Sequence, residues 1–479
     1  MKEIILIAIP FAAAIIALVW PKEDTRPWLL PAAALPHSGL SLWMFLDPPT
    51  WNPALWLGFD PIARAVLPAV SILFLACAGY GVSYLKTRKE RPNRVFIATL
   101  LALTGLITLS LLAQHLGLLW VAAEGATLAT VPLLHFNGTP RAFEATWKYL
   151  LVGGTGIALS LLGAFFLGYS SMHSGGEGDL TFTGLKAAAG SLSKPWLLAA
   201  WVLLLAGFGT KMGLAPMHTW KPDAYGEAPG MIGAMLAGGM TTVAFVALLR
   251  VRAVVSAAGL ESIASLTLLC LGLFSMIIAA LFLLGTPDFK RMLAYSSVEH
   301  MGILTIGASI GVGGLGAALF HVWSNVLTKG ALFLSAGNLR RAAGARTNIE
   351  VAGMTWVTPL SSRIFVVGLL AVTACPPFGP FFSELGILRA AVGSHQYITA
   401  TIFLVCLLLA FIGMTRLVFS IVDGRPRKAA WNTASLREAA GTVAPPLLLL
   451  AASLWLGLFT PRFLLEVWSS AAQILIPIP

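Results

Sequence analysis

Charged residues are scarce in this sequence. Asp, Glu, Lys and Arg make up 11% of its 479 residues, whereas soluble domains carry about a quarter. Hydrophobic residues make up 57% of the chain, and the mean hydropathy is +0.84. This composition leaves almost nothing for a water-soluble domain and indicates a protein that resides within a membrane.

Cysteine is also scarce, and the motifs of several common chemistries are missing. The four cysteines each lie within an apolar run, without metal-ligand spacing and without a Cys-x-x-Cys pair. The sequence has no phosphate-binding glycine loop, no His-Glu-x-x-His and no nucleophile elbow. We therefore expect no metal, cluster, haem or other cofactor in this chain. The cysteines are Cys77, Cys270, Cys375 and Cys406.

Long apolar runs dominate what is present. A run of about 20 apolar residues is long enough to cross a bilayer, and the sequence holds about fourteen such runs. The predicted fold is therefore an all-α polytopic membrane protein with about fourteen transmembrane helices. The runs lie near 3–20, 27–46, 62–84, 94–113, 115–134, 146–169, 196–220, 231–250, 263–284, 291–311, 314–338, 358–390, 396–422 and 443–465.

The net charge of +11 reflects basic residues that gather in every second loop. Cytoplasmic loops of membrane proteins carry the excess of Lys and Arg. This pattern predicts a multi-pass protein with both termini on the non-cytoplasmic side, and it argues against a nucleic-acid partner. The residues are Lys86, Arg88, Lys89, Arg91, Arg94, Lys290, Arg291, Arg340, Arg341, Arg346, Arg425, Arg427, Lys428 and Arg437.

Two of the runs are interrupted. The run 196–220 contains Lys211 and Pro216, and the run 358–390 contains three prolines and Glu384. Matched interruptions five runs apart point to two inverted five-helix repeats with broken helices 7 and 12. The predicted divisions are peripheral helices 1–3 in 1–90, the first repeat (helices 4–8) in 94–250, the second repeat (helices 9–13) in 263–422, and helix 14 with the tail in 443–479.

Ionisable residues within apolar runs are costly and usually face a protein interior or a water-filled path. Lys211 is the strongest such case, although a lysine near a helix end can also extend to the interface. A lone Glu124 is expected to pair with Lys211. His321 lies eight residues before Lys329, on about the same helical face, so the pair can pass protons. The alternative for His321 is a satisfied interior histidine.

Three further ionisable residues are candidates. We expect His300 to lie near His321 and Lys329 on the proton path, and Glu299 and Lys148 to be secondary. Glu299 and His300 lie inside the run 291–311, where polar contacts between helices are an equally ordinary role. Lys148 lies between Trp147 and Tyr149. That arrangement is typical of an anchor at the membrane interface.

Two motifs resemble those of a known family. Gly209-Thr-Lys-Met-Gly-Leu-Ala-Pro-Met-His-Thr-Trp220 resembles the seventh-helix signature of the antiporter-like proton-translocating subunits of complex I, Mrp antiporters and group 4 membrane-bound hydrogenases. Asp288–Gly302 is similar to the segment that opens the second half of those subunits. Ser-Ser-Val-Glu-His-Met-Gly and Pro-Pro-Phe-Gly-x-Phe-x-Ser-Glu most resemble the hydrogenase-4 component F type. The resemblance covers about residues 95–420.

The resemblance implies roles for particular residues. Glu124 matches the fifth-helix glutamate and Lys211 the seventh-helix lysine that pairs with it. Lys329 matches the central axis of the proton path, and Glu384 matches its terminal residue in helix 12. A lateral path is expected to connect these groups near the membrane midplane.

The chain also departs from the family pattern. Thr242 stands where many relatives carry a lysine in helix 8, Lys221 replaces a usual leucine, and Tyr225 replaces a usual histidine. The central relay is therefore expected to run through water, His218 and Thr242. A hydroxyl can relay a proton but cannot store a charge, so Thr242 is the expected weak point.

The resemblance implies a non-catalytic, proton-translocating subunit of a redox-driven complex, in a bacterial or archaeal cytoplasmic membrane. Its implied partners are other membrane subunits and a peripheral cytoplasmic redox arm. Iron–sulphur clusters and a nickel–iron site are expected on partner subunits, and the coupled ion is a proton or sodium. Two alternatives stay open: a subunit of a cation/proton antiporter without redox chemistry, and a structural subunit with a degenerate channel. Co-purifying nickel and iron–sulphur clusters would favour the subunit of a redox-driven complex.

Overall fold

The computed structural model describes residues 1–173, 178–344, 351–424 and 438–476. Within these ranges the chain forms helices and no β-strand, with only two isolated bridges between loop residues. The all-α prediction is therefore confirmed. Some of the basic residues used to predict topology, Arg346, Arg425, Arg427, Lys428 and Arg437, lie outside the described residues.

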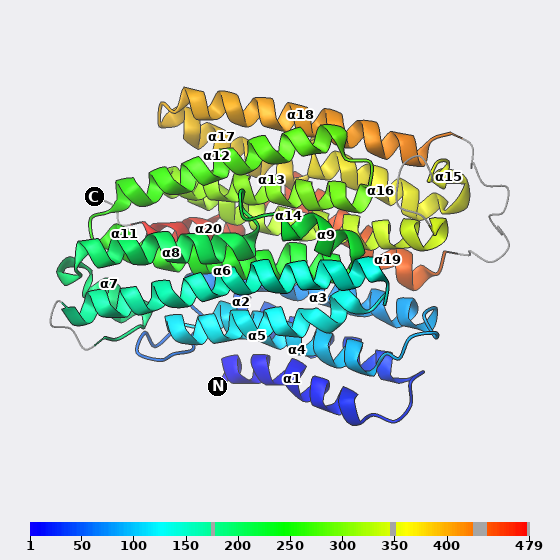
Figure 1. The fold of residues 1–479 in the computed structure, drawn as a ribbon, viewed down its shortest axis with the longest axis horizontal. Coiled ribbons are helices and arrows are strands. Elements are labelled where there is room, and N and C mark those ends of the chain that lie inside the picture. The colour runs from blue at the N-terminus through cyan, green and yellow to red at the C-terminus, as the bar shows by residue number, and fades with distance from the viewer. Residues whose placement is uncertain (174–177, 345–350, 425–437, 477–479) are drawn as a thin grey trace.

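The helices lie side by side along the long axis of the molecule (Figure 1). In chain order they are α1 (Lys2–Val19), η1 (Arg26–Trp28), α2 (Leu29–Leu46), α3 (Pro61–Lys86), α4 (Arg94–Leu112), α5 (Leu116–His135), α6 (Pro140–His173), α7 (Phe182–Ala187), η2 (Ala189–Ser191), α8 (Lys194–Met212), α9 (Trp220–Glu227), α10 (Gly230–Met235), η3 (Leu236–Met240), α11 (Thr241–Ala257), α12 (Glu261–Gly285), α13 (Phe289–Ser309), α14 (Gly311–Ala343), α15 (Met354–Val357), α16 (Pro359–Val372), α17 (Gly379–Gly393), α18 (Tyr397–Val422), α19 (Ala440–Leu458) and α20 (Arg462–Leu475).

Eleven of the described helices are long and apolar enough to cross a membrane. The fourteen expected runs include three more segments, which correspond to α13, α14 and the pair α16–α17. These three fall outside the set of eleven. The polytopic architecture is therefore confirmed, and the count of fourteen crossings stays a prediction.

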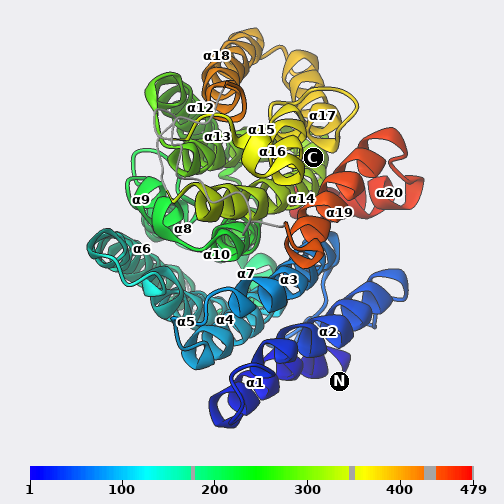
Figure 2. The ribbon, with the colours of Figure 1, turned by 90° about the vertical axis from the view of Figure 1, so that its right-hand side faces the viewer.

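Helix α14 lies inside the bundle, in contact with α13, α16, α17 and α19, as the end-on view shows (Figure 2). The span from α10 through α11 is also wholly buried. At one edge α1 and α2 lie against α4 and α3 (Figure 2). Helix α3 is more buried than α1 and α2: 78% of its most apolar stretch is buried, and the helix contacts α14 and α19 among others. The predicted division of the chain, with helices 1–3 at the periphery, stays a prediction.

Both interrupted runs are broken helices, as predicted. Helix α8 ends at Met212, and Gly213 follows in the left-handed region with φ 78° before α9 begins at Trp220. Helix α16 ends at Val372, and the chain resumes a helix only at Gly379. Helix ends at membrane depth leave main-chain groups that must be satisfied by protein or water. The division into two inverted repeats stays a prediction.

Small residues bring the helices beside these breaks close together. A side chain at Gly207 in α8 would lie 2.6 Å from the Cβ of Ser160 in α6. A side chain at Gly302 in α13 would lie 2.7 Å from the Gly272 carbonyl oxygen in α12. Close approach through glycine is a usual means of packing helices in a membrane, where apolar burial between helices gives little net drive.

Candidate functional site

The first broken helix carries Lys211 on its last turn. The side chain is 2% exposed, its ammonium nitrogen has no hydrogen-bond partner among the described residues, and it lies 5.9 Å from the centre of the Tyr149 ring. Glu124 on α5 is half-buried, and one of its carboxylate oxygens is likewise without a hydrogen bond. The two side chains interact electrostatically, as expected. Lys211 Nζ and Glu124 Oε2 each lack a hydrogen-bond partner among the described residues, so the predicted direct contact between the two side chains is not formed in this structure.

Lys221 lies on the far side of the same break, at the start of α9. It is completely buried, and its ammonium group donates to the carbonyl oxygens of Met212 at 2.7 Å and Ser297 at 3.4 Å. The lysine therefore satisfies a carbonyl group that the end of α8 leaves free. It also interacts electrostatically with Lys329. Sequence reasoning noted Lys221 only as a departure from the family pattern, although a lysine immediately after an intramembrane helix break was a usable signal.

Lys329 lies on α14, completely buried. Its ammonium group donates to the Ser296 hydroxyl on α13 at 2.6 Å. Glu299, one turn further along α13 and 3% exposed, interacts with Lys329 electrostatically. The structure therefore brings together two residues that the sequence analysis weighed separately.

A chain of side-chain hydrogen bonds links α13, α14 and α17. His300 Nδ1 and His321 Nε2 are 2.8 Å apart, and His321 Nδ1 lies 2.9 Å from the Ser383 hydroxyl. All three side chains are buried. The expected proximity of His300 and His321 is thus realised as direct contact, whereas Ser383 was missed because a serine in an apolar run gives little signal.

Glu384 is adjacent to this chain. The side chain is 3% exposed, and both carboxylate oxygens are without a hydrogen-bond partner among the described residues. It interacts electrostatically with Glu299 and Lys329. The terminal residue of the expected path is therefore close to its central lysine.

Thr242 forms a hydrogen bond within its own helical segment. Its hydroxyl donates to the Gly238 carbonyl oxygen at 2.5 Å, within the π-helical turn η3 that precedes it. A hydroxyl bonded to the main chain of its own helix has its proton committed there. The buried lysine that interacts with Lys329 is Lys221. A relay through Thr242 stays an untested prediction.

His218 and Lys148 line a pocket of about 380 Å³ beside the first turn of α9. Lys148 forms ion pairs with Asp223 at 3.0 Å and with Glu144 at 2.6 Å, and Arg291 also pairs with Asp223. His218, which is 8% exposed, interacts electrostatically with Lys221. Lys148 thus lies at a charged opening, and His218 lies at the same opening, within the α8–α9 break. The predicted roles of both residues in proton transfer stay untested.

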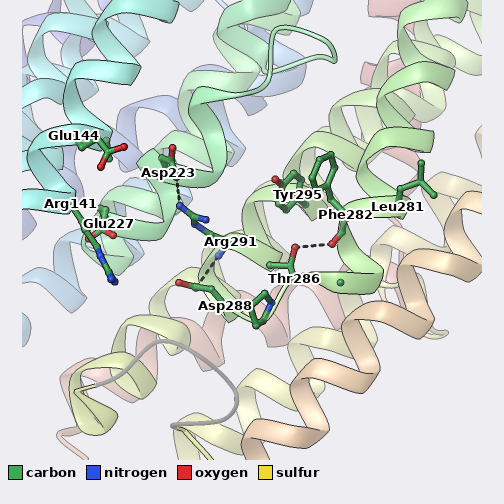
Figure 3. Close-up of a pocket in the computed structure, with 13 residues that line it drawn as sticks. Arg141, Glu144, Asp223, Glu227, Leu281, Phe282, Thr286, Asp288, Arg291 and Tyr295 are labelled. Atoms are coloured by element: carbon green, nitrogen blue, oxygen red, sulfur yellow. Dashed lines mark hydrogen bonds and ion pairs between the residues drawn. The ribbon is translucent and has the colours of Figure 1, made fainter.

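A second, larger pocket of about 800 Å³ adjoins this opening (Figure 3). Both pockets are lined by Asp223, Phe282, Arg291 and Tyr295. Figure 3 shows Asp223 and Arg291 directed toward one another at the upper side of the pocket, with Asp288 below. A polar depression therefore leads from the surface of the bundle to His218.

Comparison with known proteins places this arrangement in a family. Residues 113–410 match the model of the transmembrane NADH:quinone oxidoreductase/Mrp antiporter family. The matched segment contains every one of the buried ionisable groups described above.

Two curated relatives extend the match. A hydrogenase-4 component F homolog from Methylacidiphilum infernorum is 36% identical over 329 residues, which cover 67% of this chain and 68% of the relative. The NADH-quinone oxidoreductase subunit N of Desulforudis audaxviator is 31% identical over 387 residues, covering 80% of this chain and 75% of that protein.

The fold is shared with a solved structure of the membrane-bound sulfane sulfur reductase, an archaeal respiratory membrane complex. The TM-score is 0.89 at 21% identity, and the match covers 99% of this chain and 98% of the other. The curated relatives and this structural neighbour carry the names of multi-subunit complexes. The chain belongs to the NADH:quinone oxidoreductase/Mrp antiporter membrane family and is an antiporter-like membrane subunit of the complex-I-like type.

Proposed function

We propose that this chain translocates protons as one membrane subunit of a redox-driven complex of the hydrogenase type. The observation that carries the proposal is the series of buried titratable side chains from one broken helix to the other. Lys211, Lys221, Lys329 and Glu384 are each at most 3% exposed. Buried ionisable groups within a membrane span are rare and usually mark an ion path.

The proposed path crosses the bundle between the two breaks. Glu124 and Lys211 interact at one end, Lys221 and Lys329 in the middle, and Lys329 and Glu384 at the other end. Like charges at close range disfavour simultaneous protonation of Lys221 and Lys329. A proton arriving on one lysine therefore promotes release from the other, which is the basic requirement of a relay.

Proton access is proposed through the charged pocket at His218 and the larger pocket that adjoins it. Histidine titrates near neutral pH, and the ion-paired groups at the opening can hold protons and water at its surface. His218 interacts with Lys221 electrostatically, which gives the access route a direct link to the central lysines. Glu384 is the proposed release residue toward the non-cytoplasmic side.

The wider assignment rests on the relatives. The named relatives include a hydrogenase-4 component and a subunit of an NADH-quinone oxidoreductase. We infer partner membrane subunits, a peripheral redox arm that holds iron–sulphur clusters and a nickel–iron site, and residence in the inner membrane. The basic residues Arg88, Lys290, Arg340 and Arg341 surround one pocket at one end of the bundle. By the charge rule that end faces the cytoplasm, so both termini lie on the opposite side.

The test has two parts. Affinity purification of the full-length chain in mild detergent should co-purify nickel and iron–sulphur proteins. Inverted vesicles that contain the complex should then acidify when supplied with the electron donor that the purified complex oxidises, and Lys211→Ala should abolish acidification while donor oxidation partly persists. Unchanged acidification in Lys211→Ala would contradict the proposal.

A cation/proton antiporter without redox chemistry is the second candidate. It is favoured by the matched family model, which includes Mrp antiporter subunits, and by the fact that buried lysines serve either function equally well. Recovery of only small hydrophobic membrane subunits, without nickel or iron, would establish this second function in place of the first.

A further inference from the structure

Three side chains from different helices meet beside the second break. His300 on α13, His321 on α14 and Glu384 on α17 each offer a ligand atom, and these atoms all lie within 4.8 Å of one another. The side chains are 1%, 0% and 3% exposed, respectively. Among the described residues, they form the group of histidines, cysteines and carboxylates that has the geometry to hold a metal ion.

The cluster has donor atoms that the protein leaves without partners. Both carboxylate oxygens of Glu384 are buried without a hydrogen bond among the described residues. The great majority of buried polar side-chain atoms in proteins have at least one partner, so each exception calls for an explanation. A carboxylate in an apolar interior is especially costly unless a proton or a cation accompanies it.

The hydrogen bonds hold His321 in place. Its Nδ1 lies 2.9 Å from the Ser383 hydroxyl, and its Nε2 lies 2.8 Å from His300 Nδ1. When His321 Nδ1 donates its proton to the Ser383 oxygen, Nε2 carries the lone pair that an ion can bind. A ligating histidine usually donates its other ring proton in this way, which fixes the ring and its tautomer.

The distances suit a tetrahedral ion. Zinc–nitrogen bonds of about 2.0–2.1 Å place two ligand atoms about 3.4 Å apart. His300 Nδ1 and His321 Nε2 are 2.8 Å apart, and the three ligand atoms all lie within 4.8 Å of one another, a range that includes this value. Two imidazoles and one carboxylate are a usual zinc ligand set that leaves the fourth position open.

The local charge also accommodates a cation. Glu299, Lys329 and Glu384 interact with one another electrostatically. Lys221 also interacts with Lys329 and His300, so two carboxyl groups and two amines surround the cluster. A divalent ion bound at Glu384 takes up the charge of the carboxylate, and its binding releases protons from neighbouring groups.

An approach to the cluster exists from outside the bundle. Glu384 lines a pocket of about 280 Å³ between the α16–α17 break and α18. The rest of the lining is largely apolar, with Phe403 and Leu407 among its residues. The carboxylate is thus the polar end of an otherwise apolar opening.

We propose that His300, His321 and Glu384 form a binding site for a divalent transition-metal ion of the zinc type, and that the bound ion blocks proton transfer. The ion replaces the His300–His321 hydrogen bond and occupies Glu384. The blocking effect rests on the proposed function, whereas the binding itself does not. The site is an inhibitory one, distinct from any resident cofactor.

Binding is tested with Co²⁺ as a spectroscopic probe for Zn²⁺. The full-length chain, purified with its native partners and stripped with a chelator, should develop the visible absorption of tetrahedral Co²⁺ at one equivalent per chain, and Zn²⁺ should remove it. His321→Gln and Glu384→Gln should each abolish the signal. His395→Gln is the matched control, because His395 is exposed at the α17–α18 turn and bonds only Tyr397 among the described residues.

The Ser383→Ala variant tests the site without removing a ligand, so its result does not depend on whether the ligand variants fold. It keeps all three ligands but removes the partner of His321 Nδ1, and loss of such a partner costs about 10–100-fold in metal affinity. A Co²⁺ signal that is absent in the wild type, or that survives His321→Gln and Glu384→Gln, would overturn the proposal. A normal Co²⁺ signal combined with acidification that is insensitive to Zn²⁺ would refute the blocking effect alone. Loss of acidification in Lys211→Ala, measured in parallel, reports on the proposed function separately.

Discussion

The two broken helices differ in how the groups beside them are satisfied. At the α8–α9 break, Lys211 has no hydrogen-bond partner among the described residues, and Lys221 donates to main-chain carbonyls. At the α16–α17 break, His300, His321 and Ser383 form a continuous chain of side-chain hydrogen bonds. One region therefore holds positive charge, and the other offers groups that both donate and accept protons.

This difference assigns separate tasks to the two halves. A lysine that binds carbonyl oxygens can only donate, so it holds its proton until a neighbouring charge changes. Histidine and serine side chains can pass a proton on by exchanging donor and acceptor roles. Lys221, beside the first break, interacts electrostatically with Lys329 on α14. This interaction connects the lysine region to the histidine region.

Lys221→Leu is expected to have a large effect on proton translocation. The change restores the residue usual in the family but removes the buried cation beside Lys329 and leaves the Met212 carbonyl without its partner. Acidification of inverted vesicles should fall by about 10²-fold, the scale of losing a positioned proton-transfer group. Lys194→Leu, at the exposed start of α8, is the control and should behave as the wild type.

A second variant sharpens that result. Thr242→Lys in the Lys221→Leu background returns a lysine to the position that many relatives use. Partial recovery of acidification would show that the lysine at position 221 on α9 takes the place of a lysine at position 242 on α11. A full-rate Lys221→Leu protein would show that the lysine serves only to close the helix break.

Glu384→Gln should nearly abolish acidification while the oxidation of the electron donor partly survives. The amide cannot accept a proton, although it matches the carboxylate in size. Proton movement in vesicles and donor oxidation should be measured on the same preparation. Equal loss of both activities would indicate a damaged assembly, and intact acidification would remove Glu384 from the path.

Ser383→Ala is expected to have a smaller effect. It removes one hydrogen bond to His321, which is worth about 1 kcal/mol, or a factor of about five in rate. Acidification should slow by that factor, with donor oxidation unchanged. A Ser383→Thr protein, which keeps the hydroxyl, should recover most of the rate, and its failure to do so would point to packing instead of proton transfer.

Thr242→Val should have the smallest effect. The hydroxyl bonds its own helix at Gly238, so its loss removes neither a titratable group nor a contact between the two breaks. We expect acidification within experimental error of the wild type. A clear slowing would restore Thr242 to the relay that the sequence suggests.

The sequence predicts the helices and the breaks because both depend on local composition. Long apolar runs specify the spans, and Pro216 with its neighbours specifies the end of α8 near Met212. Family motifs correctly single out Lys211, Lys329 and Glu384 as buried groups. Their roles in proton transfer remain predictions.

The contacts between distant helices could not be predicted in the same way. Ser383 and Lys221 acquire their importance only when α13, α14 and α17 pack together, and no local pattern encodes that packing. The expected Glu124–Lys211 pair also depends on the distance between α5 and α8, which composition does not fix. The direction of the Thr242 hydroxyl, which bonds the Gly238 carbonyl oxygen, likewise could not be read from a resemblance to the family.

The most direct test of the central claim is vesicle acidification by the Lys329→Ala protein. Lys329 is the group that interacts with Lys221 on one side and with Glu299 and Glu384 on the other. If protons cross the bundle between the two breaks, Lys329→Ala vesicles should not acidify, although the assembled complex still oxidises its donor. Acidification at the wild-type rate would contradict the lateral path and identify the chain as a structural subunit.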